Sequence, residues 1–385
     1  MKIINLSSIA NPISISVQNP SQSDYDRFIG LEHYDSGEPV ITRFQGTELL
    51  TTSAKAFKAN DILIARRNVY LKRAGIVFFD GITSGDSIIL RLKEDTQKTI
   101  GYSREDLIRY IPFILNSEHF WIYANKHADG MNSKRISKDT LLEYEFELPS
   151  IDEMRDISDK LWAAYRLKEA YKKLLVTTDE MVKSQFIEMF GSMDTTPVGE
   201  YVLDSFPGEW GKEDTNGTGV KVIRTTNFTN SGKLNLTDVI TREIEMKKVN
   251  KKRIMKYDTI LERSGGTTDN PVGRVVLFEE DGLYLCNNFT QVLRFKDIDP
   301  RFAFYSLFYF YQTNKTAIRG MGNKTTGIQN LNMSKYLGIG IPNASVEQQK
   351  AFTAIAEQAD KSKSVIQKAL VYLNDIQSDE LGKIA

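Results

Sequence analysis

This chain contains almost none of the residues from which disulfides and metal sites are built. Its 385 residues include one cysteine, Cys286, and three histidines. A single cysteine cannot form an internal disulfide, and a zinc site would need nearly every histidine present. Cys286 lies in an apolar, strand-like run, so we expect a buried core thiol rather than a reactive one. The sequence therefore predicts no metal site.

Long apolar segments and an excess of charge are also absent. No run approaches about 18 uninterrupted apolar residues, the length that spans a bilayer, and the start of the chain lacks the basic and apolar regions of a signal peptide. We expect a cytoplasmic protein with no membrane partner. The 50 basic and 50 acidic residues cancel, but a basic face can be offset elsewhere, so nucleic acid is not excluded.

What the chain does contain is a repeat. Asp61 begins the sequence Asp-Ile-Leu-Ile-Ala-Arg, and Asp258 begins Asp-Thr-Ile-Leu-Glu-Arg 197 residues later. Four segments of the first half recur in order in the second: residues 30–37 and 224–232, residues 61–66 and 258–263, the apolar runs after Gly75 and after Gly273, and the closing Leu148-Pro149 and Ile341-Pro342. Two similar halves predict two similar domains that present two similar surfaces.

The order of the chain is globular, helical, globular, helical. Short β-rich runs with turn signals between them indicate mixed domains with antiparallel sheet. We predict an α+β fold of two pseudo-twofold-related mixed α/β domains, joined by two long antiparallel coiled-coil helices. The predicted segments are a first domain at 1–150, a central helix at 151–192, a second domain at 193–342 and a C-terminal helix at 343–385.

Both helical stretches show the three-and-four spacing of a coiled-coil seam. The first lacks glycine and proline until Gly191 and would be roughly 60 Å long if fully helical; Lys168 is the only conspicuous gap in its seam. Ser345 makes a plausible start for the second. We expect the two helices to pack on each other as a strut, while the alternative is that each packs only on its own domain. The predicted strut and partner-docking residues are Ile157, Leu161, Tyr171, Leu175, Phe352, Ile355, Ile366 and Leu373.

Catalytic motifs are not found. Residues 320–326 resemble a phosphate loop, but Asn323 interrupts its Gly-Lys-Thr order. Residues 269–271 lack the second proline and the aromatic of the loop with which amino-methyltransferases hold a flipped base. The three histidines are near no Ser or Cys nucleophile motif. We therefore predict no catalytic residue in this chain.

Basic and amide-bearing loops occur at matching places in both halves. Arg, Lys and Asn read base edges, and Ser, Thr and Lys hold phosphates, so these loops predict contact with DNA. For any single loop, a solvated surface is the competing interpretation. The predicted DNA-binding residues are Arg66, Arg67, Asn68, Lys72, Arg73, Asn132, Lys134, Arg135, Lys251, Lys252, Arg263, Ser264, Thr267, Thr268, Asn270, Arg274, Asn323, Lys324 and Thr325.

Taken over its whole length, the chain resembles a specificity (S) subunit of a type I restriction-modification system. The similar features are the repeated Asp-Ile-Leu-Ile-x-Arg pattern, the Leu/Ile-Pro endings, the acidic helix starts at 152–154 and 347–349, and the sequence Ser-Gln-Phe-Ile-Glu-Met-Phe-Gly at 184–191. The lead before the first repeat is shorter than is common in the family, which leaves open how the edge of the first domain is finished.

The resemblance implies a non-catalytic protein with two target recognition domains, each of which reads one half-site of a bipartite DNA target. Because the residues that follow the repeated strands differ between the halves, 66–69 against 263–266, we expect the target to be asymmetric. The helices of this chain would dock two methyltransferase (M) subunits, and restriction (R) subunits would join them. S-adenosylmethionine, ATP and Mg would be used by those partners, and none would be bound by this chain. The alternatives are a stand-alone DNA methyltransferase or nuclease, and a coiled-coil scaffold without a DNA role.

Overall fold

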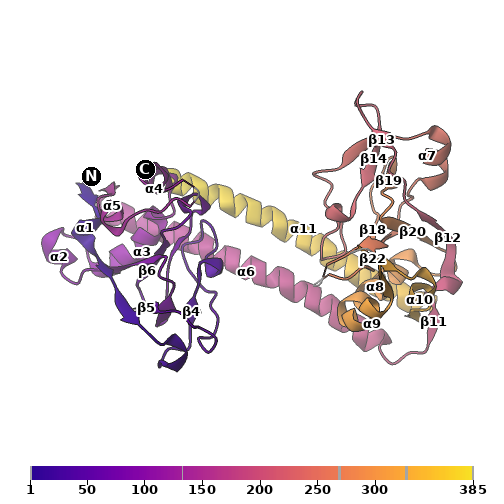
Figure 1. Cartoon of the computed structure of the whole chain (residues 1–385), viewed down its shortest axis with the longest axis horizontal. Coiled ribbons are helices and arrows are strands. Elements are labelled where there is room, and N and C mark those ends of the chain that lie inside the picture. Colours follow the sequence, from indigo (N-terminus) through magenta and orange to yellow (C-terminus); the bar gives the residue numbers. More distant parts are fainter. Residues whose placement is uncertain (1, 132, 268–269, 326–327, 384–385) are drawn as a thin grey trace. The chain divides into compact units, whose positions relative to one another are not determined.

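The chain divides into two compact units. Unit 1 comprises Met1–Lys173 with Ile366–Ala385, and unit 2 comprises Leu174–Val365. The computed structural model describes residues 2–131, 133–267, 270–325 and 328–383. Each unit contains a sheet-rich globular part and one segment of each long helix (Figure 1). The boundaries between the units fall inside the long helices, at 173/174 and 365/366, and do not test the predicted segment boundaries at 150, 192 and 342. Those boundaries remain a prediction.

The strands of unit 1 form two sheets and one terminal pair. They are β1 Lys2–Asn5, β2 Ala10–Ile13, β3 Ile15–Val17, β4 Phe28–Ile29, β5 Ala54–Phe57, β6 Ile62–Ala65, β7 Ala74–Ile76, β8 Gly81–Thr83, β9 Ser87–Leu92 and β10 Glu145–Leu148. The first sheet has the order β2-β9-β6-β7 and the second the order β3-β5-β8-β4. β1 pairs antiparallel with β10, so the two ends of the domain meet.

Short helices cover the first sheet of unit 1. They are α1 Leu6–Ile9, α2 Thr96–Thr99, α3 Arg104–Ile114, α4 Glu118–Lys126 and α5 Lys138–Leu142, with 3-10 turns at Pro20–Gln22, Leu31–His33 and Val69–Leu71. The Ser103 and Ser117 hydroxyls cap α3 and α4 by accepting backbone N–H groups two or three residues inside each helix. Strand β6 is buried on both faces because the helices pack on one side and the second sheet lies on the other.

The strands of unit 2 follow the same plan with one addition. They are β11 Thr195–Pro197, β12 Val202–Pro207, β13 Lys212–Glu213, β14 Val220–Ile223, β15 Ile240–Glu243, β16 Thr259–Glu262, β17 Ser264–Gly265, β18 Val275–Leu277, β19 Tyr284–Cys286, β20 Thr290–Phe295, β21 Gly322–Thr325, β22 Ile328–Leu331 and β23 Gly340–Pro342. The sheets are β12-β20-β16-β18, β13-β15-β14-β19 and the terminal pair β11-β23. The addition is the small sheet β17-β22-β21.

An aromatic core fills the helical side of unit 2. Its helices are α7 Met246–Lys252, α8 Pro300–Thr313, α9 Lys315–Gly320 and α10 Met333–Leu337, with 3-10 turns at Val198–Tyr201 and Thr225–Asn227. Phe302 and Phe304 of α8 are almost fully buried in this core. Cys286 is also buried, and burial raises the pKa of its thiol to about 11, which confirms the predicted core thiol.

The same ion pair holds the first sheet in both units. Asp61 accepts two hydrogen bonds from the Arg91 guanidinium, each of 2.7 Å, and a third from the backbone N–H of Lys58 at 2.8 Å. Asp258 accepts the matching bonds from Arg294 at 2.9 and 2.7 Å, and one from the N–H of Met255 at 2.7 Å. The repeated aspartate is therefore a structural residue that fixes the start of β6 and of β16.

Left-handed backbone also recurs at matching places. Asn68 (φ 54°) and Lys72 (φ 49°) bracket the β6–β7 loop, and Gly265 (φ 112°) and Gly273 (φ 110°) bracket the β16–β18 loop. The register of the sheets shows that Gly75 corresponds to Val276, because Leu63 pairs with Gly75 where Ile260 pairs with Val276. The sequence match of Gly75 with Gly273 was therefore wrong, and Gly273 corresponds to Lys72.

The second sheets differ in strand order. β4 and β14 correspond, because each precedes a matching 3-10 turn, at Leu31–His33 and at Thr225–Asn227. In unit 1, β4 is an edge strand that pairs parallel with β8, whereas in unit 2, β14 lies inside its sheet, antiparallel to β15 and parallel to β19. The predicted similarity of the halves therefore holds for the first sheet, while the second sheet has diverged.

The two long helices begin with the same cap. They are α6 Ile151–Phe190 and α11 Val346–Gly382. Ser150 and Glu153 exchange hydrogen bonds at the first, and Ser345 and Gln348 do the same at the second, so both starts are capping boxes. This confirms the predicted start of α11. None of the described helices is long and apolar enough to cross a membrane.

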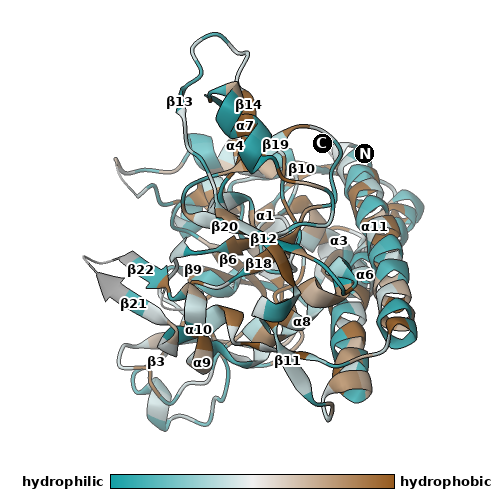
Figure 2. Ribbon diagram, turned by 90° about the vertical axis from the view of Figure 1, so that its right-hand side faces the viewer, coloured by the Kyte–Doolittle hydropathy of each residue, from teal (hydrophilic) through white to brown (hydrophobic). Residues whose placement is uncertain are grey.

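Within each unit the two helices pack antiparallel. In unit 2, Lys363 of α11 reaches Asp179 of α6, while Phe352, earlier on α11, packs against Phe186, later on α6, at 5.2 Å between ring centroids. Figure 2 shows apolar and polar faces along both helices. The fold class is thereby confirmed as α+β with antiparallel long helices.

The residues of the predicted seam are buried to different extents. Leu161 and Phe352 are fully buried, Ile366 and Leu373 are 8% exposed, and the other four predicted residues, Ile157, Tyr171, Leu175 and Ile355, are half-buried. Leu161 and Phe352 also belong to the cores of their own domains. The helices thus pack both on each other and on their domains, so the two alternatives do not exclude one another.

The gap in the seam is filled by a buried ion pair. Lys168 is only 7% exposed, and its ammonium group donates to Gln377 Oε1 at 2.9 Å and lies 3.4 Å from Glu38 Oε1. Its side chain therefore joins α6, α11 and the domain of unit 1. A buried polar residue at one seam position is a known means of fixing helix register.

Candidate nucleic-acid interface

Two segments far apart in the sequence form one loop surface in unit 1. The backbone N–H of Asn68 donates to Lys134 O at 2.8 Å, and the N–H of Ile136 donates to Arg66 O at 3.0 Å. The Arg67 guanidinium donates to the Ser133 hydroxyl at 2.7 Å. The structure therefore brings together the β6–β7 loop and residues 133–136, as the predicted DNA-binding set requires.

An acidic side chain lies among the basic ones of this surface. Asp86 accepts hydrogen bonds of 3.3 and 3.4 Å from Arg135 and lies 3.9 Å from the Arg67 guanidinium. Lys55 lies beside the same turn and donates to Gly85 O and Ser87 O, both at 2.9 Å. Burial lowers the pKa of Lys55, and the nearby positive charge of Arg66 lowers it further. The surface is therefore basic, with Asp86 orienting two of its arginines.

Lys72 and Arg73 make their contacts inside unit 1. The Lys72 ammonium bonds the Glu118 carboxylate, and Arg73 donates to Leu31 O and Arg67 O, both at 3.0 Å. Arg73 thus supports the loop from behind. Lys134 and Arg67 are exposed, while Asn132 lies outside the described residues. DNA contact by any of these side chains stays a prediction.

In unit 2 the corresponding surface is built by the small sheet. Ser264 and Gly265 of β17 pair with Asn330 and Gln329 of β22, and β22 pairs with β21, which contains Asn323, Lys324 and Thr325. The Ser264 hydroxyl donates to Asn330 Oδ1 at 2.6 Å. Arg263 precedes this sheet, and its guanidinium lies 3.5 Å from Gln291 Oε1. The predicted loops of unit 2 are therefore brought together as those of unit 1 are.

The β16–β18 loop is tied to the domain at its C-terminal end. Arg274 forms a two-pronged ion pair with the buried Glu262, at 2.7 and 3.2 Å, and donates to Thr225 O at 3.4 Å. The hydrogen bonds with Glu262 raise the pKa of Arg274. The Tyr311 hydroxyl donates to Pro271 O at 2.9 Å.

Arg274 therefore supports its loop, as Arg73 does in unit 1. Asn270 is half-buried beside it, and Thr267 is exposed at the tip, where its hydroxyl accepts the N–H of Asn270 at 3.0 Å. Thr268 lies outside the described residues.

The lysines of α7 lie apart from these loops. Figure 1 places α7 beside β19, at the end of unit 2 away from β22. Lys252 donates to Glu209 at 2.8 Å and to Gly208 O at 3.2 Å, while Lys251 is exposed. The hydrogen bond from Lys252 lowers the pKa of Glu209, and a second from Lys248 lowers it further. The structure therefore does not place Lys251 and Lys252 with the other predicted residues.

Sequence reasoning missed Lys55 and Asp86. Lys55 is on β5, and its only sequence signal is a lysine between two alanines in an apolar strand. Asp86 lies in the sequence Ser84-Gly85-Asp86, which by itself signals only a turn. Their place beside Arg66 and Arg135 depends on pairings across 20 residues or more, so no local pattern could reveal it.

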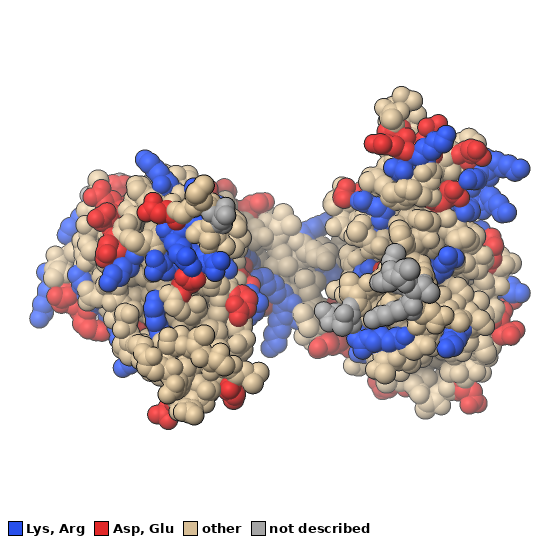
Figure 3. Space-filling model, viewed as in Figure 1, with Lys and Arg blue, Asp and Glu red and all other residues tan. Residues whose placement is uncertain are grey.

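In both units, basic loops thus follow the strands of the first sheet, in which an aspartate–arginine ion pair links two neighbouring strands. Figure 3 shows Lys and Arg side chains gathered across the middle of the visible face of unit 1, with acidic ones among them. Among the described residues, no group of three or more His, Cys, Asp or Glu side chains could hold a metal ion. Fold and surface together define a class: a two-domain protein with duplicated polar loops and two long helices.

The comparisons with known proteins agree with that class. Residues 207–370 match the family model described as "Type I restriction modification DNA specificity domain". The whole chain is similar in fold to the S subunit of a type I restriction-modification system from M. genitalium, with 16% identity, a TM-score of 0.54, and coverage of 100% of this chain and 95% of that one.

A second solved structure gives the same result. It comes from work on complex assembly and conformational transition of a type I R-M system, with 15% identity, a TM-score of 0.54, and coverage of 100% and 97%. No curated protein sequence matches the chain significantly. The resemblance to type I specificity subunits is thereby confirmed.

Proposed function

We propose that this chain is the non-catalytic DNA-recognition subunit of a type I restriction-modification complex. Each unit would read one half of a bipartite target through its loop surface. The observation that supports this best is the different length of the two loops between the left-handed residues: three residues (69–71) in unit 1 and seven (266–272) in unit 2. Loops of unequal length on similar first sheets favour two different half-sites, and hence an asymmetric target.

Reading by such loops follows from general features of DNA recognition. Base edges in the major groove are read by a few Arg, Asn or Gln side chains, whereas phosphate contacts supply most of the affinity. Arg67 and Asn323 are exposed and would take the first role. Salt-sensitive binding to random duplexes would come from the remaining basic side chains.

Exposed apolar residues of α6 support the docking of partner subunits. Leu167 in unit 1 is 42% exposed, and Leu174 and Met181 in unit 2 are 47% and 52% exposed. Residues spaced by seven lie on one stripe of a helix, which is the pattern of a second coiled-coil seam. We infer that two methyltransferase subunits pack there, that restriction subunits join them, and that the complex works in the cytoplasm.

The chemistry would belong to those partners. S-adenosylmethionine, ATP and Mg would be bound by the methyltransferase and restriction subunits, while this chain supplies binding and orientation. A stand-alone methyltransferase is disfavoured by the absence of a catalytic motif, and methyl transfer by the purified chain alone would revive it. A scaffold without a DNA role would show no salt-sensitive complex with duplex DNA when the methyltransferase subunit is present.

A domain exchange tests the proposal. Replacing residues 193–342 with the corresponding domain of another specificity subunit should change one half of the methylated motif and leave the other half unchanged. Methylation-sensitive sequencing of a host that expresses the exchanged complex gives both halves directly. A motif that changes in both halves, or in neither, would contradict one half-site per domain.

A further inference from the structure

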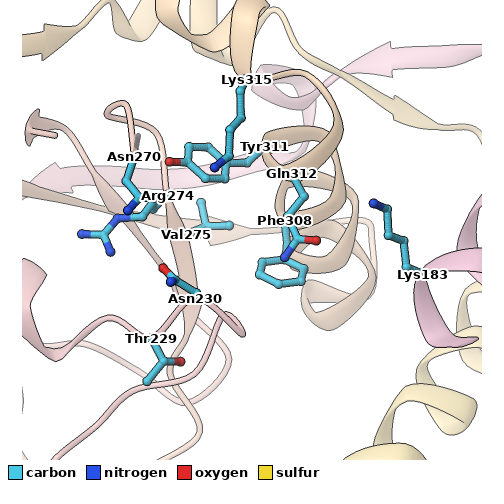
Figure 4. A pocket seen from close by; sticks show the side chains of 10 residues that line it. All are labelled: Lys183, Thr229, Asn230, Asn270, Arg274, Val275, Phe308, Tyr311, Gln312 and Lys315. Atoms are coloured by element: carbon cyan, nitrogen blue, oxygen red, sulfur yellow. The ribbon is translucent and has the colours of Figure 1, made fainter. Parts of the chain in front are cut away.

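A cavity of about 300 Å³ lies in unit 2 behind the β16–β18 loop. Four elements contribute to it: the turn at Thr229 and Asn230, the loop end with Asn270 and Arg274, the α8–α9 junction, and Lys183 on α6. Figure 4 shows these side chains around the space. Its size is at the lower end of small-molecule sites.

The polar groups of the cavity are suited to a nucleobase. Asn230 and Gln312 are exposed and Asn270 is half-buried, and within the described part of the chain their side-chain amides have no hydrogen-bond partner. Carboxamides pair with base edges because each offers a donor and an acceptor side by side. Three unengaged amides facing one space can therefore hold a planar group that has donors and acceptors on its edge.

An aromatic ring and a cation complete the set. Phe308 is half-buried, and its ring lies at the cavity (Figure 4) while it stacks on Phe304 at 5.6 Å between centroids. Stacking on such a ring stabilises any base. Lys183 also has no partner among the described residues, and an ammonium group is a suitable contact for phosphate. Arg274 adds no free charge because Glu262 neutralises it.

The corresponding cavity of unit 1 has different chemistry. It measures about 640 Å³ and is lined by Glu38, Asn116, Glu118 and Ser378, among others. Glu118 and Lys315 are the first residues of the equivalent helices α4 and α9, and Glu118 is paired with Lys72. Where unit 2 has Lys183 on α6, unit 1 has Ser378 on α11, 195 residues further along the chain. The repeated frame therefore leaves a cavity in both units, and the side chains that line it differ.

We propose that the unit 2 cavity binds one nucleotide, with the base between Phe308 and the three amides and the phosphate at Lys183. The nucleotide could be free in solution or belong to the DNA as an unstacked residue; only the second source rests on the proposed DNA-reading function. Flipping a base out of a duplex costs unstacking and unpairing free energy, which the stacking and amide contacts would offset.

Calorimetric titration of the full chain with AMP, TMP and adenosine tests free binding. We expect one equivalent of AMP per chain and weaker binding of adenosine, which has no phosphate. Lys183→Ala should reduce AMP affinity about tenfold, as for one charged hydrogen bond, and leave adenosine unchanged. Gln312→Ala should weaken both ligands. Ser378→Ala, at the matching position of unit 1, is the control and should change neither.

A second arm tests DNA as the source. Duplexes containing the methylated motif, with 2-aminopurine at each position in turn, should gain fluorescence at one position on binding, and Gln312→Ala should abolish that gain. A response in this arm alone supports the proposal with DNA as the source. No AMP binding together with no gain at any position would overturn it, as would binding that is insensitive to both variants. The domain exchange is independent of this result, so DNA reading can stand while the cavity proposal fails.

Discussion

At the scale of residues, the loop surfaces divide into side chains that support and side chains that face outward. The guanidinium groups of Arg73 and Arg274 donate hydrogen bonds to carbonyl or carboxylate groups of their own domain. Arg67, by contrast, has a side chain that is 46% exposed; among the described residues, its guanidinium contacts the Ser133 hydroxyl and lies 3.9 Å from Asp86. Only the outward group can exchange its contacts for DNA at small cost.

Replacing such an outward residue should affect one half-site. We expect Arg67→Ala or Asn323→Ala to cost about 1–3 kcal/mol of binding free energy, that is roughly five- to 150-fold in affinity, if the side chain reads a base. Competition binding with duplexes altered in one half-site measures this. Arg73→Ala serves as a comparison, since it should lower the stability of the loop rather than discrimination between bases. Equal losses at both half-sites would contradict the assignment.

A second prediction at this scale concerns the contribution of the buried aspartates to stability. Asp61 is 1% exposed and holds Arg91 and a backbone N–H, so Asp61→Ala leaves these groups without their partner. We expect unit 1 to lose about 3–5 kcal/mol, the usual effect of breaking a buried pair. Asp258→Ala should do the same to unit 2. Denaturant unfolding should show one transition moved and the other retained; if both move together, the units do not unfold separately.

At the scale of elements, each long helix is attached to its domain by specific polar contacts as well as by its seam. Arg155 on the first turns of α6 donates to both oxygens of Asp106 on α3, at 2.8 and 3.0 Å. Lys363 on α11 contacts Asp179 and Asp360, and Lys233 of the domain reaches the same Asp360 at 2.8 Å. These bonds orient the helix on the domain, which apolar packing alone leaves free to slide.

The contact between Asp106 and Arg155 gives a pH prediction. The hydrogen bonds from Arg155 lower the pKa of Asp106 below its ordinary value. Because the folded pKa is the lower one, the added stability is present above about pH 4, the unfolded value, and is lost as pH falls through the folded pKa.

The unfolding free energies of the wild-type chain and Asp106→Asn should therefore differ at neutral pH and converge in acid. Measuring both between neutral pH and pH 3 tests this. A constant difference across that range would mean that the carboxylate charge has no part in the contact.

At the scale of the whole molecule, helix α6 has two different faces. One face is buried in the seam and the domain cores, and the other exposes Leu167, Leu174 and Met181. These side chains are about half exposed, so they contribute less to the fold of the isolated chain than the buried face does. Their use would be to bind partner helices in the assembled complex.

Substitutions on the two faces should separate folding from assembly. Leu174→Glu should leave the helix content and unfolding of the chain unchanged but weaken the complex with the methyltransferase subunit, seen by size-exclusion chromatography. Leu161→Glu places a charge at a fully buried position, so it should unfold unit 1 itself. If the Leu174→Glu chain still forms the full complex, the stripe is not the docking surface.

The sequence by itself determined the repeat, the α+β class, both long helices and the capped start of α11. These features depend on local order: apolar spacing, Ser at a helix start, and an aspartate at the start of a strand. It could not determine that Asp61 would be held by Arg91, or that Gly273 would correspond to Lys72 rather than Gly75, because strand register sets both.

Only the tertiary structure decided which basic residues face outward. Four other basic side chains carry the same positive charge as Arg67: Lys72, Arg73, Lys252 and Arg274. Their hydrogen-bond partners lie 6 to 49 residues away along the chain and hold them against the domain. Likewise Lys168, a gap in a linear pattern, is a buried link between two helices and a domain. A hydrogen bond depends on distance in space, and sequence order does not encode that distance until the chain has folded.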